Sequence, residues 1–172
     1  QRIVKNEEGL GRDLGLICTA RGLKMRVLSR EEPVEIRIAP FGIVIDRKKG
    51  EARIQFAREV IERMPAEADA IMDGYDAALS RLDGPFDAET FLSHCLCAWQ
   101  AARAATAAKG DRVEVTDFLP YLALQRQEQK FYRDPTQKSF RDYTRVQFAW
   151  DVMRLREARM FVCDGWRLNI GA

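Results

Sequence analysis

The chain has 172 residues, of which 47% are hydrophobic and 31% charged, a composition typical of one globular domain or two small ones. No apolar run reaches the roughly 18 residues of a membrane-spanning helix, and residues 1–30 are too charged for a secretion signal, so we expect a cytoplasmic protein without a membrane partner.

Residues 61–120 hold 5 basic and 11 acidic side chains, whereas residues 121–172 hold 10 basic and 6 acidic ones. This distribution argues against a protein that coats nucleic acid on all sides, but it is compatible with one basic face.

The cysteines and the single histidine do not form a recognisable metal or disulfide pattern. Cys18, Cys95, Cys97 and Cys163 are scattered, and His94 stands next to the Cys95-x-Cys97 pair in a predicted helix. Successive helical positions point about 100° apart, so these three side chains cannot converge on one metal ion without ligands from elsewhere in the chain. We therefore predict free cysteines packed as small hydrophobic residues, no metal and no cofactor.

The first 57 residues predict an ambiguous segment followed by a small sheet. Helical spacing in residues 1–30 is weakened by four glycines, which match no nucleotide-binding loop. Alternating or short apolar runs then predict strands over 34–38, 41–46 and 51–56, which would form a small antiparallel meander. The basic tip at Arg47, Lys48 and Lys49 fits either a solvated turn or a phosphate contact.

Residues 58–82 change to helical spacing. A short helix is predicted up to Pro65, and a second one carries an apolar stripe from Ala68 to Leu79 with acidic residues on its solvent side. Gly84-Pro85 interrupts the pattern. We therefore predict two domains, residues 1–84 and 85–172, in an α+β and mostly helical protein.

The second domain reads as helix, short strand, helix, turn, long helix and hairpin. Asp87 should cap a helix over 88–109, and Val113 and Val115 suggest a short strand over 112–115. Thr116 should cap a helix that continues to about Tyr132. After a turn over 133–139, Ser139 is a candidate cap for a helix over 140–159, and Asp164-Gly165 predicts a type I′ hairpin turn.

This order of elements resembles a winged helix-turn-helix. The resemblance covers residues 86–170 and implies a fold that binds DNA or joins subunits of a larger assembly, although the 133–139 turn is longer than in the strict motif. The predicted last helix is apolar around most of its circumference, so only its ends could reach a nucleic acid. In this resemblance the closing hairpin corresponds to the wing. The N-terminal end of the last helix and this hairpin supply the candidate nucleic-acid-binding residues, which are Lys138, Arg141, Thr144, Arg145 and Arg167.

Two functional hypotheses follow. In the first, the chain is a DNA-binding module; in the second, it is a protein–protein interaction domain, with Arg141, Arg145, Arg156 and Arg159 used in ion pairs. No nucleophile, phosphate loop or metal-ligand pair indicates an enzyme. Because the chain begins with Gln1 and ends directly after a predicted strand, we expect it to be part of a larger protein or complex.

Overall fold

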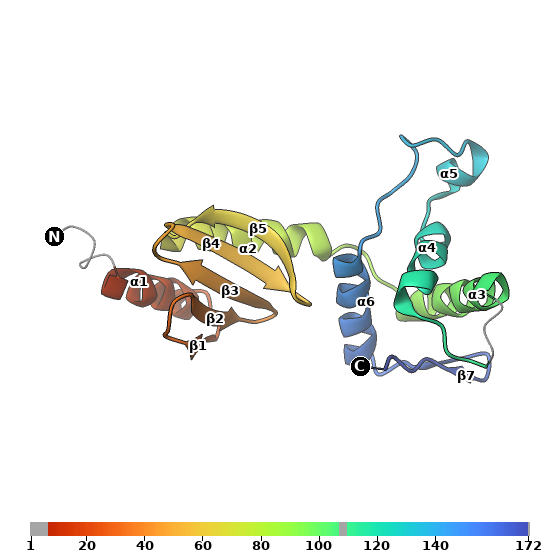
Figure 1. Cartoon of the computed structure of the whole chain (residues 1–172), viewed down its shortest axis with the longest axis horizontal. Helices are drawn as coiled ribbons and strands as arrows, with labels where there is room; N and C mark the ends of the chain where they lie inside the picture. Colours follow the sequence, from red (N-terminus) through yellow and green to blue (C-terminus); the bar gives the residue numbers. More distant parts are fainter. Residues whose placement is uncertain (1–6, 107–109, 172) are drawn as a thin grey trace. The chain divides into compact units, whose positions relative to one another are not determined.

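The computed structural model describes residues 7–106 and 110–171. The chain divides into two compact units, residues 1–84 and 85–172, and the division falls at the Gly84-Pro85 step (Figure 1). Both helices and strands are present, as an α+β protein requires.

Unit 1 is a five-stranded antiparallel sheet with two helices. In chain order its elements are α1 (Glu7–Ala20), β1 (Met25–Ser29), β2 (Val34–Ile38), β3 (Phe41–Asp46), β4 (Glu51–Phe56), β5 (Glu59–Pro65) and α2 (Ala68–Leu82). The strands lie in the order β1-β2-β3-β4-β5 (Figure 1). The three predicted strands and the second predicted helix are confirmed, but the expectation of a small three-stranded meander is wrong, because one further strand is added at each edge.

Strand β5 replaces the helix that was predicted before Pro65. Ala57 and Arg58 both have positive φ, 51° and 68°, and Phe56 pairs with Glu59 across them. Positive φ at both central residues is typical of a two-residue type I′ turn. Sequences that form this turn usually have Asn or Gly at these two positions. Neither residue is present here, so the sequence carries no local sign of the hairpin.

One face of the sheet forms the core of unit 1. Its buried residues alternate along the strands, and the largest of them, Phe41, contacts Phe56 and Tyr75 edge to face with ring centroids 6.1 and 5.4 Å apart. Helices α1 and α2 contact each other, and α2 also contacts β4 and β5. At the basic tip, Arg47 pairs with Glu32 and Lys49 with Asp46, which supports a solvated turn.

Unit 2 contains α3 (Ala88–Thr106), α4 (Val115–Gln125), α5 (Gln129–Arg133), α6 (Arg145–Glu157), β6 (Val162–Cys163) and β7 (Trp166–Arg167). Helix α3 begins as predicted, with the Thr90 N–H donating to Asp87 Oδ1 at 2.7 Å; its predicted end at residue 109 lies outside the described residues. The closing hairpin is also confirmed, since Asp164 and Gly165 have φ of 48° and 79°. The core comprises Phe91, Leu92, Cys95, Ala98, Phe118, Leu122, Phe148, Val152 and Leu155.

Several elements of unit 2 differ from the prediction. No strand forms over 112–115 in the described part of the chain; Val115 begins α4, so Glu114 and not Thr116 is its N-cap. Helix α4 ends at Gln125 and a separate short helix, α5, follows. The physical reason for the missing strand is that residues 112–113 find no strand beside them to pair with.

Helix α6 begins five residues later than predicted. Thr144, not Ser139, is its N-cap, and the Thr144 hydroxyl accepts the Gln147 N–H at 3.2 Å. Arg141 cannot join the helix because the Gln127 side chain binds both its backbone N–H and its carbonyl, at 2.7 and 2.9 Å. Tertiary contacts therefore decide where this helix starts.

Candidate functional site

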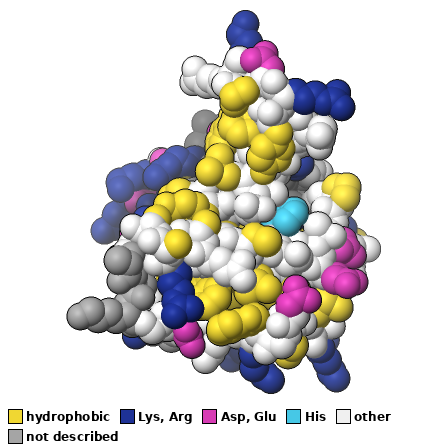
Figure 2. All heavy atoms as spheres, turned by 90° about the vertical axis from the view of Figure 1, so that its right-hand side faces the viewer, with side chains coloured by type: hydrophobic (Ala, Val, Ile, Leu, Met, Phe, Trp, Pro, Cys, Tyr) yellow, Lys and Arg dark blue, Asp and Glu magenta, His cyan; other side chains and the backbone are white. Residues whose placement is uncertain are grey.

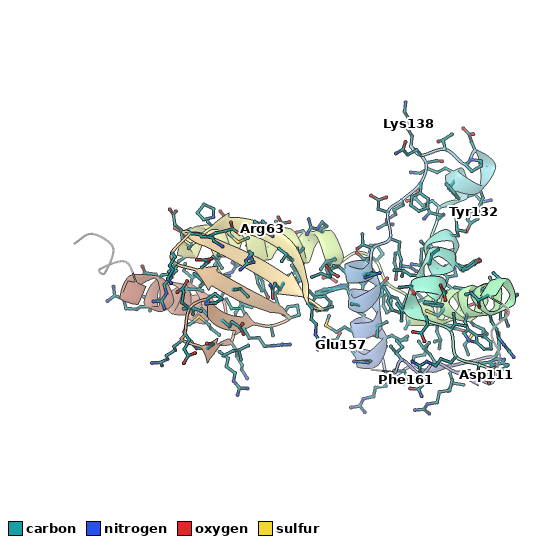
Figure 3. All side chains as sticks on the ribbon, viewed as in Figure 1. Arg63, Asp111, Tyr132, Lys138, Glu157 and Phe161 are labelled. Atoms are coloured by element: carbon teal, nitrogen blue, oxygen red, sulfur yellow. The ribbon has the colours of Figure 1, made fainter. Side chains whose placement is uncertain are left out.

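Residues 129–145, which we call the basic lobe, combine positive charge with aromatic side chains. They contain five basic and two acidic residues, a net charge of +3. Figure 2 shows blue basic side chains above and beside a group of yellow hydrophobic ones at the top of the view, with magenta acidic atoms among them. Figure 3 places Lys138 and Tyr132 in this part of unit 2. Interleaved cations and aromatic rings are the surface features that bind phosphates and stack on bases.

Within the basic lobe, aromatic contacts connect α5 to the segment that precedes α6. The Phe131 ring lies 5.5 Å from that of Phe140 and 5.8 Å from that of Tyr132, in edge-to-face arrangements. The Tyr132 hydroxyl donates to the carbonyl of Leu124 at the end of α4. Tyr132 and Phe140 are nevertheless 55% and 37% exposed, so their rings are accessible to a ligand.

The lobe is fixed at its base by Gln127, which is only 8% exposed. Its amide nitrogen donates to the carbonyls of Ala123 and Arg141, and its amide oxygen accepts the Arg141 N–H. The side chain thus joins the end of α4 to the segment before α6. The buried Gln127 amide makes three hydrogen bonds, as a buried polar group requires. Two of them are to the backbone of Arg141, so they fix the position of that residue.

A buried ionic cluster around Asp151 anchors the other end of the lobe. Asp151 is fully buried on α6; it accepts hydrogen bonds from the Tyr143 hydroxyl at 2.8 Å and from Arg154 at 2.6 Å. Gln147 lies 3.3 Å away and the Arg126 guanidinium 3.7 Å away. Burial, with the Asp151 charge beside it, raises the pKa of Tyr143 far above its usual range, so the phenol stays protonated and keeps donating.

Four of the five predicted binding residues lie on the lobe. Lys138 and Arg141 are in the connection before α6, Thr144 is the N-cap, and Arg145 is the first residue of the helix. The Thr144 hydroxyl is used by the cap, whereas the three cations are exposed. The predicted ion pairs of Arg141, Arg145, Arg156 and Arg159 are not formed among the described residues of unit 2; Arg126 and Arg154 make the buried pairs instead.

Arg167 lies apart from the other four. It is on β7 and lines a cavity of about 570 Å³ together with residues of α3 and of the segment before α4, including Asp111. Figure 3 shows Asp111 and Lys138 at opposite ends of unit 2. The structure therefore does not combine Arg167 of the closing hairpin with the lobe into a single basic surface.

Sequence reasoning missed the two residues that organise the lobe. Asp151 is fully buried on a helix that the sequence predicts to be apolar around most of its circumference, and no sequence prediction gave it a role. The available signal was a lone carboxylate among apolar residues, three positions before an arginine. Gln127 offered no signal, because its partner Arg141 is 14 residues away.

The cysteines and His94 are not arranged as a metal centre. Cys95 is buried, and burial raises its pKa to about 12, whereas Cys97 is exposed. Among the described residues, no group of three or more His, Cys, Asp or Glu side chains could hold a metal ion. Two of the four predicted hydrophobic cysteines, Cys18 and Cys95, are buried.

We expect His94 to make unit 2 less stable in mild acid. Its Nδ1 is buried without a hydrogen-bond partner among the described residues, and burial, together with the Arg126 charge, lowers its pKa below 6.5. The unfolded chain therefore binds a proton more readily, so this contribution to stability is complete above pH about 6.5 and is lost as the pH falls toward the folded pKa. Urea unfolding at several pH values between about 7.5 and 5, followed by tryptophan fluorescence, measures it.

The control is His94→Gln, which cannot titrate in this range. Its unfolding free energy should change less with pH than that of the unaltered protein. Identical pH profiles for the two proteins would contradict this role of His94.

No described helix has the length and apolarity needed to cross a membrane. Comparison of the chain with protein-family models, with curated proteins and with solved structures finds no match.

Proposed function

We propose that unit 2 is a DNA-binding module and that the basic lobe is its contact surface. The observation that carries this proposal is the set of four exposed cations, Arg133, Lys138, Arg141 and Arg145, none of which has an acidic partner among the described residues. Such cations are free to replace the counterions of a phosphate backbone. The N-terminus of α6 adds a partial positive charge next to Arg145.

The exposed rings of Tyr132 and Phe140 add a second mode of contact. Bases stack on aromatic side chains with little dependence on sequence, at about 1–3 kcal/mol per base. Phosphate contacts from the lobe position the nucleic acid, and these rings can hold unpaired or distorted bases. No group in the lobe suggests a reaction, so we infer a binding role and not an enzymatic one.

The experiment is a fluorescence-anisotropy titration with a labelled duplex of about 20 base pairs and with one of its strands. If four phosphates are contacted, affinity should fall about 100-fold between about 50 and 200 mM salt. Arg141→Glu combined with Arg145→Glu should abolish most of the binding at low salt and flatten the salt dependence.

The matched control is Arg156→Glu combined with Arg159→Glu, which changes the net charge equally at the other end of α6. This variant should bind nearly as well as the unaltered protein. Equal losses in the two double variants would indicate nonspecific attraction, and no micromolar binding at low salt would refute the proposal.

A protein-binding role, the alternative to DNA binding, is supported by a separate feature of unit 2, the cavity beside the closing hairpin.

A further inference from the structure

Two segments with the pattern of β-strands line the cavity of unit 2. In the first, Val113 is half-buried between exposed Arg112 and Glu114. In the second, residues 167–170, Leu168 and Ile170 are half-buried and alternate with exposed residues. A period of two is the mark of a strand with one face on a core.

The middle of each segment is unpaired. At the ends of the first segment, the Asp111 carbonyl accepts the Trp99 indole N–H at 2.8 Å, and the Glu114 carbonyl accepts the Asp117 and Phe118 N–H groups of α4. The Leu168 N–H donates to the Phe161 carbonyl at 2.8 Å and so extends the hairpin by one bond. Beyond it, Arg112, Val113, Asn169 and Ile170 make no backbone hydrogen bond to any described residue. An extended segment with unpaired N–H and C=O groups is a template for another strand.

The cavity between them has the size and lining of a binding site. Its volume of about 570 Å³ lies within the usual range for ligand pockets. The lining is mostly apolar and includes Leu92, Leu96, Phe118, Phe148, Leu168 and Ile170. Trp99 and Trp166, whose ring centroids are 4.9 Å apart, also contribute to the lining.

The charges at the rim leave one cation unbalanced. Asp111 pairs with Arg103 at 3.4 Å, and Arg112 pairs with Glu114 at 3.4 Å. Arg167 is exposed and has no acidic partner among the described residues. A ligand that fits this site should therefore be apolar on one side and carry one carboxylate.

We propose that the cavity binds an extended segment of a partner protein, which adds as a β-strand between residues 111–114 and 167–171. Its backbone pairs with the free groups of the two segments, alternate apolar side chains enter the cavity, and one Asp or Glu side chain meets Arg167. An extended peptide accounts for the unpaired backbones, which a small apolar acid would not. This site is separate from the basic lobe and does not depend on DNA binding.

The test is a selection from a displayed library of random peptides of about seven residues on the intact chain. We expect enriched peptides to alternate apolar and polar residues and to include one acidic residue. Hydrogen exchange should show the amides of Arg112, Val113, Asn169 and Ile170 exposed in the free protein. With peptide bound, one amide of each neighbouring pair should become protected, because successive N–H groups of a strand point to opposite edges. The fluorescence of Trp99 and Trp166 should change in the same titration.

Arg167→Glu should weaken the selected peptides about tenfold, and a peptide with Lys in place of its acidic residue should bind this variant better. Arg156→Glu, an equal charge change away from the cavity, should leave the affinity unchanged. Because both arginines are exposed, neither variant should impair folding.

Several outcomes would overturn the proposal. These are no enrichment, enriched peptides that leave the four amides unprotected, and protection of those amides in the free protein, which would mean that the two segments pair with each other. Saturable binding of decanoate without any selected peptide would assign the cavity to a small apolar acid. Concentration-dependent self-association that protects the same amides would assign it to a second copy of the chain.

Discussion

Replacing Asp151 by alanine is expected to lower the free energy of unfolding of unit 2 by about 3–5 kcal/mol. The carboxylate is fully buried and compensates two guanidinium groups, those of Arg126 and Arg154, whose side chains are only 22% and 13% exposed. Removing it leaves Arg126 in a poorly hydrated site without an acidic partner among the described residues, takes one hydrogen bond from Arg154, and removes the acceptor of the Tyr143 hydroxyl. Breaking one side of a buried ionic cluster costs more than the cluster itself contributes, because uncompensated charge stays buried.

Tryptophan fluorescence during urea unfolding measures this effect, since Trp99, Trp150 and Trp166 all lie in unit 2. Asp142→Ala is the matched control, because Asp142 is exposed and has no ion-pair partner among the described residues. Its cost should stay within about 0.5 kcal/mol. If Asp151→Ala and Asp142→Ala lowered the free energy of unfolding by the same amount, the Asp151 cluster would not be what stabilises unit 2.

The hydrogen bond between Tyr143 and Asp151 can be tested separately from the rest of the Asp151 cluster. The Tyr143 side chain contacts α6 through its hydrogen bond to Asp151, and the Arg126 guanidinium lies 5.8 Å from the centre of its ring. Tyr143→Phe keeps the ring and removes the hydroxyl, so it should cost less stability than Asp151→Ala, about 1–2 kcal/mol.

Replacing Phe41 by alanine is expected to destabilise unit 1 by about 3–5 kcal/mol. The ring is fully buried between Phe56 and Tyr75, at the start of the central strand β3. Its removal forfeits the transfer free energy of the ring and leaves a cavity that the sheet can close only in part. The Tyr75 hydroxyl bond to Ala39, 2.9 Å long, lies next to this cavity and should weaken with it.

Because unit 1 has no tryptophan, amide hydrogen exchange of β2, β3 and β4 provides the readout. Phe41→Leu keeps most of the volume and should recover much of the lost protection. Val44→Ala, a half-buried position on the opposite face of β3, should cost far less. Protection that is unchanged in Phe41→Ala would contradict the central place of this ring in the core.

Local sequence signals predicted those elements whose ends are decided by neighbouring residues. Asp87 caps α3 through the backbone N–H of a residue three positions away. Asp164 and Gly165 form a hairpin turn because both residue types adopt its positive φ values readily, without contacts to distant residues. The alternating pattern of β2 and the apolar stripe of α2 likewise show in the sequence, since one face of each is buried.

Contacts between distant residues decided the rest. Strand β5 forms because β4 offers an edge to a segment whose spacing suits a helix equally well, and residues 112–113 stay unpaired because no strand lies beside them. Helix α6 starts at Arg145 because Gln127 holds Arg141 from 14 residues away. The basic residues of the lobe could be read from the sequence, but the buried Asp151 and Gln127 that orient them could not. Hydrogen bonds and burial of this kind depend on which side chains the folded chain brings together, and sequence spacing does not encode that directly.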